Sequence, residues 1–435
     1  MASTYLTRTP SSTGNTKKFT ISYWIKRTGL GTEQDIFHAY PGSGSRSQIL
    51  FNSANQLKLD LENNTNNLIT NRLFRDTSAW YHIVIVYDSD NSTSSDRLKI
   101  YVNGVRETSF ATAQYPSSGS TSQINTTTQH EISSYDGAGY YFEGSMSHIH
   151  FTDGYVYDAT AFGEYDANGV WKIKTSPSVT YGTNGFFILK DGNSVTDQSG
   201  NGNNFTVAGG TLTKTEDSPS NVFATLNPLD NYYASSTFSN GNNTIVTNSS
   251  NYTYNSSTLA FSSGKYYCEA KLVALDKPET IIGISSKLAT SSTSIMGSDV
   301  YSQGYRSSGN SYTNNVQLSY GSSYTAGDII GLAIDADNNK LYFHKNGTWQ
   351  NSGDPTSGAT GTGALSFPTD NDGVYYVTMY DIDGSGSCTW STNFGNGYFG
   401  TTAVSSAGTN ASGIGIFEYD VPTGFTALST KGLNL

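Results

Sequence analysis

Residues 328–349 read DIIGLAIDADNNKLYFHKNGTW, and this stretch determines the fold class of the chain. Residues 329–335 are largely apolar, as in a buried strand, and a polar turn follows at Ala336–Asn339. The segment from Lys340 to His344 then alternates between apolar and polar residues, and Asn346-Gly347 forms a second turn. Asn-Gly is the strongest short hairpin signal, because a type I′ turn needs positive φ at both central positions. The stretch therefore predicts consecutive antiparallel strands.

The first half of the chain repeats this order. A buried-type run, WYHIVIVYD (80–88), precedes RLKIYVNGVRET (97–108), which predicts a hairpin with its turn at Asn103-Gly104. In KFTISYWIKR (18–27) the apolar residues at odd positions point one way, and Thr20, Ser22 and Trp24 point the other; QLKLDLEN (56–63) alternates in the same manner. Helical periodicity is nearly absent, and turn residues recur roughly every 8–12 residues. We expect an all-β protein of two jelly-roll β-sandwiches in tandem.

The composition excludes several classes of protein. Only 14% of the 435 residues are charged, the net charge is −11, and no Lys/Arg cluster occurs, which excludes a nucleic-acid footprint and disfavours anionic membranes. No stretch approaches the ~20 apolar residues of a membrane span, and MASTYLTRTPSSTGN (1–15) lacks the apolar core of a signal peptide. The 31 tyrosines and many Ser, Thr and Asn residues are typical of a rigid, loop-rich β protein.

Changes in composition divide the chain into three parts. A first sandwich covers residues 1–160, and a second covers 223–435. Between them, residues 161–222 form a predicted connector with short strands, which contains FGEYDANGVWKIK (162–174) and the turn-dense DQSGNGNNF (197–205).

Four segments of the first part resemble a laminin-G/concanavalin-A-like domain: FTISYWIKR (19–27), WYHIVIVYD (80–88), LKIYVNGV (98–105) and EGSMSHIHFTDG (143–154). The second part resembles a SPRY domain in GKYYCEAKL (264–272), GDIIGLAIDADNNKLYFHKNGTW (327–349) and NFG (393–395). Both resemblances imply jelly-roll sandwiches and a binding role.

The order of motifs also resembles surface or fibre-like virion proteins of tailed marine phages. YLTRTPSSTGNTKKFTISYWIKR (5–27), FGEYDANGVWKIK, DQSGNGNNFTV (197–207) and SPSNVFATLNPLD (218–230) carry this resemblance. It implies a fibre, tip, knob or capsid-decoration protein at the virion surface, assembled in the host cytoplasm with other virion proteins as a trimer or higher homo-oligomer. It further implies attachment to a host surface glycan or protein. No heptads or collagen-like tract mark a long shaft, so a compact knob fits as well as a fibre.

Catalysis is the alternative for this fold, since a polysaccharide hydrolase needs two carboxylates across a cleft. The acidic pairs Asp335/Asp337, Asp370/Asp372 and Asp381/Asp383 all fall in predicted turns, where Asp accepts backbone hydrogen bonds. No G-x-S-x-G elbow occurs, and His148 and His150 lack a third zinc ligand. We therefore expect no catalytic residue and no nucleic-acid or membrane partner. A polysaccharide-degrading hydrolase and a bacterial surface adhesin remain the alternatives.

Candidate binding residues lie in loops. Tyrosine rings can stack on sugars, so two tyrosine-rich loops are glycan-binding candidates. Clustered oxygens at alternating positions suit calcium, although an Asx-rich turn without metal is the competing interpretation. Cys268 and Cys388 lie in predicted strands, where two buried free thiols are favoured over a single bridge. The glycan candidates are Tyr135, Asp136, Tyr140, Tyr141, Tyr301, Tyr305 and Tyr312, and the calcium candidates are Asp197, Asn201, Asp381 and Asp383.

Overall fold

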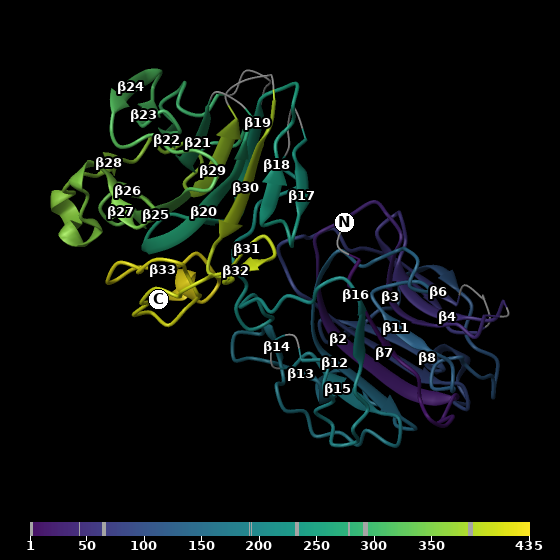
Figure 1. Cartoon of the computed structure of the whole chain (residues 1–435). Helices are drawn as coiled ribbons and strands as arrows, with labels where there is room; N and C mark the ends of the chain where they lie inside the picture. Colours follow the sequence, from purple (N-terminus) through teal and green to yellow (C-terminus); the bar gives the residue numbers. More distant parts are fainter. Residues whose placement is uncertain are drawn as a thin grey trace. The chain divides into compact units, whose positions relative to one another are not determined.

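The computed structural model describes residues 3–42, 44–62, 67–190, 192, 194–230, 235–276, 279–289, 295–381 and 386–435. The chain divides into two compact units, residues 1–214 and 215–435 (Figure 1). Each unit consists of two packed antiparallel sheets with short 3₁₀ turns, which confirms the predicted all-β class of tandem concanavalin-A-like sandwiches. Among the described residues, no helix has the length and apolar character that a membrane span requires.

Within the described part of unit 1, one sheet has eight strands. Its order is β10 (Phe110–Ala113), β6 (Leu68–Leu73), β5 (Gln56–Asp60), β4 (Ser47–Phe51), β3 (Gln34–Ala39), β11 (His130–Ile132), β1 (Tyr5–Arg8) and β16 (Thr206–Gly209). The second sheet of the same described ranges has six strands, in the order β15 (Phe186–Ile188), β12 (Gly144–Asp153), β2 (Lys18–Arg27), β7 (Tyr81–Asp88), β8 (Leu98–Val102) and β9 (Val105–Arg106).

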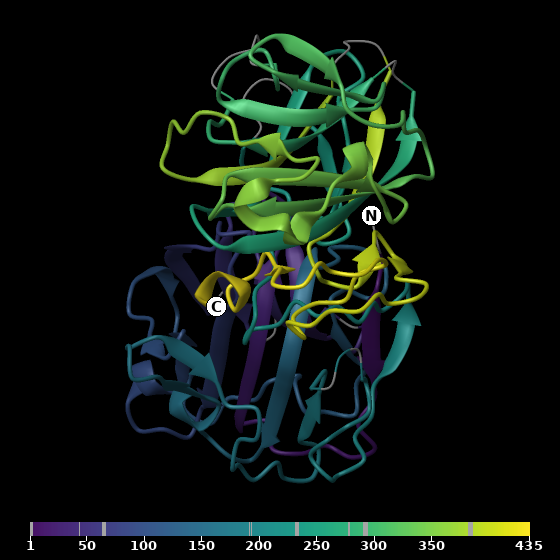
Figure 2. The ribbon, with the colours of Figure 1, turned by 90° about the vertical axis from the view of Figure 1, so that its left-hand side faces the viewer.

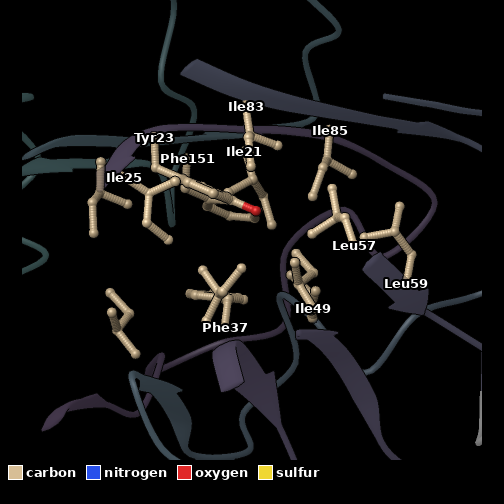
Figure 3. Packing of buried hydrophobic residues seen from close by; sticks show 14 of the residues in the cluster. Ile21, Tyr23, Ile25, Phe37, Ile49, Leu57, Leu59, Ile83, Ile85 and Phe151 are labelled. Atoms are coloured by element: carbon tan, nitrogen blue, oxygen red, sulfur yellow. The ribbon is translucent and has the colours of Figure 1, made fainter. Parts of the chain in front are cut away.

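The core of unit 1 lies between these two sheets. Figure 3 shows Ile21, Tyr23 and Ile85 of the six-stranded sheet pointing toward Phe37 and Ile49 of the eight-stranded sheet. All five are at most 2% exposed. Burial of such side chains is the main favourable term for the fold, at roughly 1.5–3 kcal/mol for each fully buried large apolar side chain.

Both predicted Asn-Gly turns are confirmed. Asn103 and Gly104 have φ values of 49° and 84°, and Asn346 and Gly347 have 48° and 82°. Positive φ at both positions is the backbone of a type I′ hairpin, which matches the right-handed twist of the strands that it joins.

The outer face of the six-stranded sheet is also buried, which the alternation in residues 18–27 did not predict. Trp24 stacks on His82 with ring centroids 4.7 Å apart, and Trp171 covers His82 from the hairpin of β13 (Gly163–Tyr165) and β14 (Trp171–Ile173). The indole Nε1 of Trp171 lies 3.0 Å from His82 Nδ1. A segment that was predicted to connect two domains therefore covers a sheet of the first one.

The predicted connector, 161–222, contributes two further strands to unit 1. β15 pairs with β12, and β16 pairs with β1. The division between the units falls after Lys214, close to the end of the predicted connector and not at residue 160.

Within the described part of unit 2, the larger sheet has nine strands. Its main path is β17 (Thr237–Ser239), β18 (Thr244–Val246), β30 (Cys388–Asn393), β20 (Lys265–Leu275), β25 (Ile329–Asp335), β26 (Lys340–Lys345) and β27 (Thr348–Trp349); β28 (Leu365–Ser366) pairs with β26, and β33 (Thr426–Ala427) pairs with β20. The facing sheet of these described residues is β19 (Thr253–Phe261), β29 (Tyr375–Asp381), β21 (Thr280–Ser285), β22 (Ser302–Arg306), β23 (Asn310–Thr313) and β24 (Val316–Ser319). A small hairpin joins β31 (Tyr398–Phe399) to β32 (Thr402–Ala403).

The C-terminal segment covers the outer face of the nine-stranded sheet. In Figures 1 and 2 this segment, in yellow, runs along the side of that sheet. Its side chains Phe417, Val421 and Phe425 form a buried cluster with Tyr267 and Tyr342. The SPRY-like sandwich is therefore incomplete without residues 417–427.

Glu269, on β20, holds the C-terminal segment in place. Its carboxylate accepts the backbone N–H groups of Glu418 and Tyr419 at 2.9 Å each, the Tyr267 hydroxyl at 3.0 Å and the Asn393 amide at 3.4 Å. Burial raises the pKa of Glu269 to about 7 in spite of these donors. Every acceptor direction of the carboxylate is used within the protein, so this buried group has a structural role.

Neither cysteine forms a disulfide, and both are buried. Cys268 pairs with Leu332, and Cys388 pairs with Leu275, so they stand seven residues apart along β20 (275 − 268). At the rise of a strand this is about 23 Å, far beyond the reach of a disulfide. Two free thiols were the favoured prediction, and the alternative of a bridge is wrong.

We predict that Glu269→Ala destabilises unit 2 by about 3 kcal/mol, because two partly buried backbone N–H groups and the Tyr267 hydroxyl would lose their acceptor. Urea unfolding of the full chain would measure this loss, and limited proteolysis would show earlier cleavage within residues 404–429. Glu216→Ala is the matched control, since Glu216 is exposed. Equal stability of the two variants would contradict the structural role of Glu269.

Candidate functional site

A row of polar side chains crosses the outer face of the eight-stranded sheet. Glu131 on β11 pairs with His38 on β3, His38 pairs with Gln48 on β4, and Gln48 pairs with Asp60 on β5. Their chain neighbours point into the core, and because successive strand residues face opposite sides, these four lie together on the other face. We call Glu131, His38, Gln48 and Asp60 the polar row.

The polar row is buried beneath a roof of other side chains. Glu131 is 3% exposed, and the other three are 1% exposed. Tyr135 stacks on His38 with centroids 4.6 Å apart. Arg46 lies over the Tyr135 ring at 5.4 Å and donates to its hydroxyl at 3.2 Å, while Arg46 Nε forms an ion pair with Asp60 at 3.7 Å.

Tyr135 belongs to the loop 133–143, and Glu131 and β3 hold this loop in position. Glu131 accepts the Ser134 hydroxyl at 2.6 Å and the Gly137 N–H at 2.9 Å. The Asp35 N–H donates to the Tyr140 carbonyl at 2.7 Å. Asp136 and Tyr140 have φ values of 52°, an uncommon conformation for these residue types that the surrounding hydrogen bonds maintain.

Three tyrosines form a surface above the polar row. The Tyr40 and Tyr135 rings are stacked at 6.0 Å, and Tyr140 meets Tyr135 edge-on at 5.8 Å. Tyr140 is 53% exposed. We call Tyr40, Tyr135 and Tyr140 the tyrosine platform; aromatic rings of this kind present a flat apolar face with polar groups at its margin.

Burial changes the charge states below the platform. The pKa of Asp35 is raised well above its usual value by burial, and the nearby carboxylates Glu33 and Glu131 add to this effect. Burial raises the pKa of Asp60 to about 6 against the opposing charge of Arg46. Burial and Arg46 lower the pKa of His38 to about 4, so its imidazole is neutral at pH 7.

Several buried atoms beneath the platform lack hydrogen-bond partners within the protein. They include Asp35 Oδ1, Gln48 Oε1, Asp60 Oδ1 and both ring nitrogens of His38. The other ends of two of these groups are engaged, since Gln48 donates its amide to Asp35 Oδ2. Buried polar atoms without partners destabilise a fold by about 1–3 kcal/mol each, and such a concentration is typical of a site built for a ligand.

The predicted glycan residues of the first loop are brought together here. Tyr135 and Tyr140 are part of the platform, and Asp136, which follows Tyr135 in the chain, is exposed. Tyr141 turns away: its ring packs on Tyr5 at 6.1 Å, and its hydroxyl donates to the Gly137 carbonyl.

The second predicted tyrosine cluster is not an exposed loop, and that prediction is wrong for two of its three members. Tyr305 is fully buried in the core of unit 2, and its hydroxyl donates to the Ser322 carbonyl. Tyr312 is 9% exposed and packs under Arg306 at 5.0 Å. Tyr301 is half-buried, with Lys287 over its ring at 5.1 Å.

The prediction that all acidic pairs fall in turns needs correction. Asp335 and Asp381 are the last residues of β25 and β29, and both are fully buried. Asp335 forms an ion pair with Lys265 at 2.7 Å and also accepts the turn N–H of Asn338. Asp337 and Asp370 accept the turn N–H groups of Gly264 and Gly373, as predicted for turn aspartates, and Asp372 accepts the side-chain amide of Asn371.

The carboxylates of the site were missed because they come from different strands. A sequence pattern can indicate only acidic residues that are close in the chain, such as pairs two residues apart. Asp35, Asp60 and Glu131 are instead brought together by the pairing of β3, β4, β5 and β11. A local signal existed at the strand ends, where Glu33/Asp35 and Asp60/Glu62 have that spacing.

The histidines of β12 pack against aromatic rings. His150 stacks on Phe187 at 3.9 Å, and its Nδ1 lies 2.9 Å from the Tyr181 hydroxyl. His148 contacts Phe187 at 5.6 Å. No cluster of three or more His, Cys, Asp or Glu side chains in the described ranges could hold a metal ion.

The calcium candidate at Asp197 forms an Asx-type turn. Asp197 Oδ1 accepts the N–H groups of Phe187 and Ser199, and Oδ2 accepts the Ser199 hydroxyl and the Asn203 N–H, all at 2.7–2.9 Å. Asn201 directs its amide nitrogen to the carbonyls of Gly182 and Gly185. Backbone donors thus occupy the oxygens that a metal would need. Asp381 lies at the end of β29, and Asp383 lies outside the described residues.

Two known domains are present in the chain. Residues 2–157, which include the polar row and the platform, match the family described as the Concanavalin A-like lectin/glucanases superfamily, and residues 265–369 match the SPRY domain. Similar solved structures include the SPRY domain of human HERC1, at 20% identity and a TM-score of 0.30, covering 38% of this chain and 96% of that chain. Stonustoxin is similar at 18% identity and a TM-score of 0.30, over 39% of this chain and 27% of its own. No curated protein matches the sequence.

We predict that Asp197→Asn destabilises unit 1 by about 1–3 kcal/mol, because an amide nitrogen would face backbone donors. Thermal unfolding would measure the loss, with Asp90→Asn at an exposed position as the matched control. Millimolar calcium or a chelator leaves Tm unchanged in both variants and in the parent chain. A rise in Tm with calcium that Asp197→Asn abolishes would instead restore the metal interpretation.

Proposed function

We propose that the chain is a non-catalytic binding protein whose first domain binds a glycan at the tyrosine platform. The observation that carries this proposal is the arrangement of Tyr40, Tyr135 and Tyr140 over buried polar atoms that lack partners. Flat rings suit the apolar faces of pyranose sugars, and unsatisfied polar atoms suit their hydroxyl groups. The presence of a lectin/glucanase-type domain and a SPRY domain supports a binding or adhesion role.

The proposed setting is the surface of a tailed-phage particle, with the chain as a homo-oligomeric fibre tip, knob or capsid decoration. The support for this setting is the order of sequence motifs described above, together with the rigid, acidic β architecture. Closed symmetry would present several copies of the platform to one host surface, which increases avidity. Gold labelling of particles with an antibody to the chain tests the setting, and unlabelled particles would overturn it.

A glycoside hydrolase is the second candidate, since Asp35 and Asp60 lie on the same sheet face and burial raises the pKa of Asp60 to about 6. A raised pKa suits a general acid. Release of reducing ends from a bound polysaccharide, abolished by Asp60→Asn, would establish this function in place of simple binding.

We predict that Tyr140→Ala weakens glycan binding at least about tenfold, because it removes an exposed stacking surface. Binding to an array of bacterial surface glycans would identify the ligand, and titration calorimetry would measure the change. Tyr165→Ala is the matched control, because Tyr165 is also 53% exposed in unit 1 but lies in the β13–β14 hairpin. Equal weakening by both variants, or no glycan binding at millimolar sugar, would overturn the proposal.

A further inference from the structure

The unsatisfied atoms beneath the tyrosine platform are mainly hydrogen-bond acceptors. Asp35 Oδ1, Gln48 Oε1 and Asp60 Oδ1 are oxygens of this kind. An amide oxygen can only accept, and so can a carboxylate once it is ionised, so in that state these atoms require donors from elsewhere.

His38 adds one more acceptor and a single donor. It is 1% exposed, and neither ring nitrogen has a partner. A neutral imidazole accepts at one nitrogen and donates at the other. Among the described residues of this site, four unsatisfied acceptors therefore stand against two unsatisfied donors, the N–H of His38 and the Nε–H of Arg46.

The carboxyl groups around these atoms also favour a ligand that carries a positive charge. Burial is the main cause of the raised pKa of Asp35, and the carboxyl groups of Glu33 and Glu131 add to it while Arg46 opposes it. Arg46 and Lys58 likewise oppose the rise that burial causes in the pKa of Asp60. Arg46 is the chain's own cation at the entrance: its side chain is 29% exposed, and its Nε lies 3.7 Å from Asp60, within ion-pair range but beyond hydrogen-bond distance.

We infer that the glycan bound at the tyrosine platform is an amino sugar whose protonated primary amine enters between Asp35 and Asp60 at the Arg46 edge. This inference rests on the proposed function and specifies its ligand. An ammonium group has three donors and no acceptor, whereas a hydroxyl brings one donor together with its own acceptor lone pairs. The incoming ammonium displaces the Arg46–Asp60 ion pair and supplies the donors that the buried oxygens lack.

Proton release follows from this arrangement. A bound cation favours the ionised form of both carboxyls, so Asp60, whose pKa burial raises to about 6, loses its proton when the amine binds near that pH. Affinity therefore rises between pH 5 and pH 7 and stops rising where the amine itself loses its proton.

The charged and titratable groups that face the site are His38 and Asp35 on β3, Glu33 before it, Arg46 before β4, Lys58 and Asp60 on β5, Glu131 on β11, and Tyr135, Asp136 and Tyr140 of the covering loop.

Titration calorimetry of the full chain with two matched sugars tests the inference. The probes are a β-1,4-linked glucosamine oligomer and the same oligomer fully N-acetylated, each in two buffers of different ionisation enthalpy. We expect the free amine to bind at least tenfold more tightly at pH 6, with a heat that depends on the buffer because Asp60 releases its proton. Equal affinity of the two oligomers, or tighter binding of a lysine oligomer than of either sugar, would overturn the inference. If either result is obtained while Tyr140→Ala still weakens glycan binding, the amino-sugar inference fails and the proposed glycan function stands.

Two variants with opposite expected signs separate a specific effect from misfolding. Asp60→Asn should weaken binding of the amine about tenfold and leave the N-acetylated oligomer unaffected. Arg46→Gln removes the competing cation and should strengthen amine binding, an outcome that a damaged fold cannot produce. Asp90→Asn is the control for net charge, since Asp90 is exposed and forms an ion pair with Lys17 at 3.7 Å. Loss of amine binding in Arg46→Gln with an unchanged Tm would contradict displacement of the ion pair.

Discussion

Every β-sheet has two faces, and the rest of this structure depends on what covers the face of each sheet that is turned away from the core. Side chains alternate along a strand, so each sheet that buries one row of apolar residues carries a second row that must be covered or hydrated. The six-stranded sheet of unit 1 is covered by the segment with Trp171, and the nine-stranded sheet of unit 2 is covered by the segment with Phe417. The eight-stranded sheet instead carries the polar row.

Two buried carboxylates show how the same chemistry serves different purposes. Glu269 is surrounded by four donors from its own chain, so its burial is balanced, and it fixes the C-terminal segment. Asp35 accepts from Gln48 at one oxygen and has no partner at the other. Such a group destabilises the free protein unless water, an ion or a ligand supplies the missing partner, and the proposed ligand would do so.

Local features of the sequence predicted the sandwich class, the strands and both Asn-Gly turns, because those depend on neighbouring residues. Contacts between distant segments could not be predicted in the same way. Tyr305 was predicted to be exposed from its Ser- and Asn-rich surroundings, yet strand pairing directs its ring into the core. Tyr135 and Tyr140 of one predicted loop do lie side by side, but the polar groups beneath them depend on the register of four strands. A single sequence does not specify that register, since a shift by one residue would exchange the two faces.

Unit 2 joins its first and last segments, since Phe223 bridges to Ser429 and β33 lies parallel to β20. During synthesis the first unit can fold as soon as residue 214 leaves the ribosome, because all of its strands precede that point. The second unit must wait for residues 417–429, so Tyr267 and Tyr342 stay uncovered until that segment has been synthesised. The order of folding thus follows from the connectivity: unit 1 can be complete before unit 2 receives its last segment.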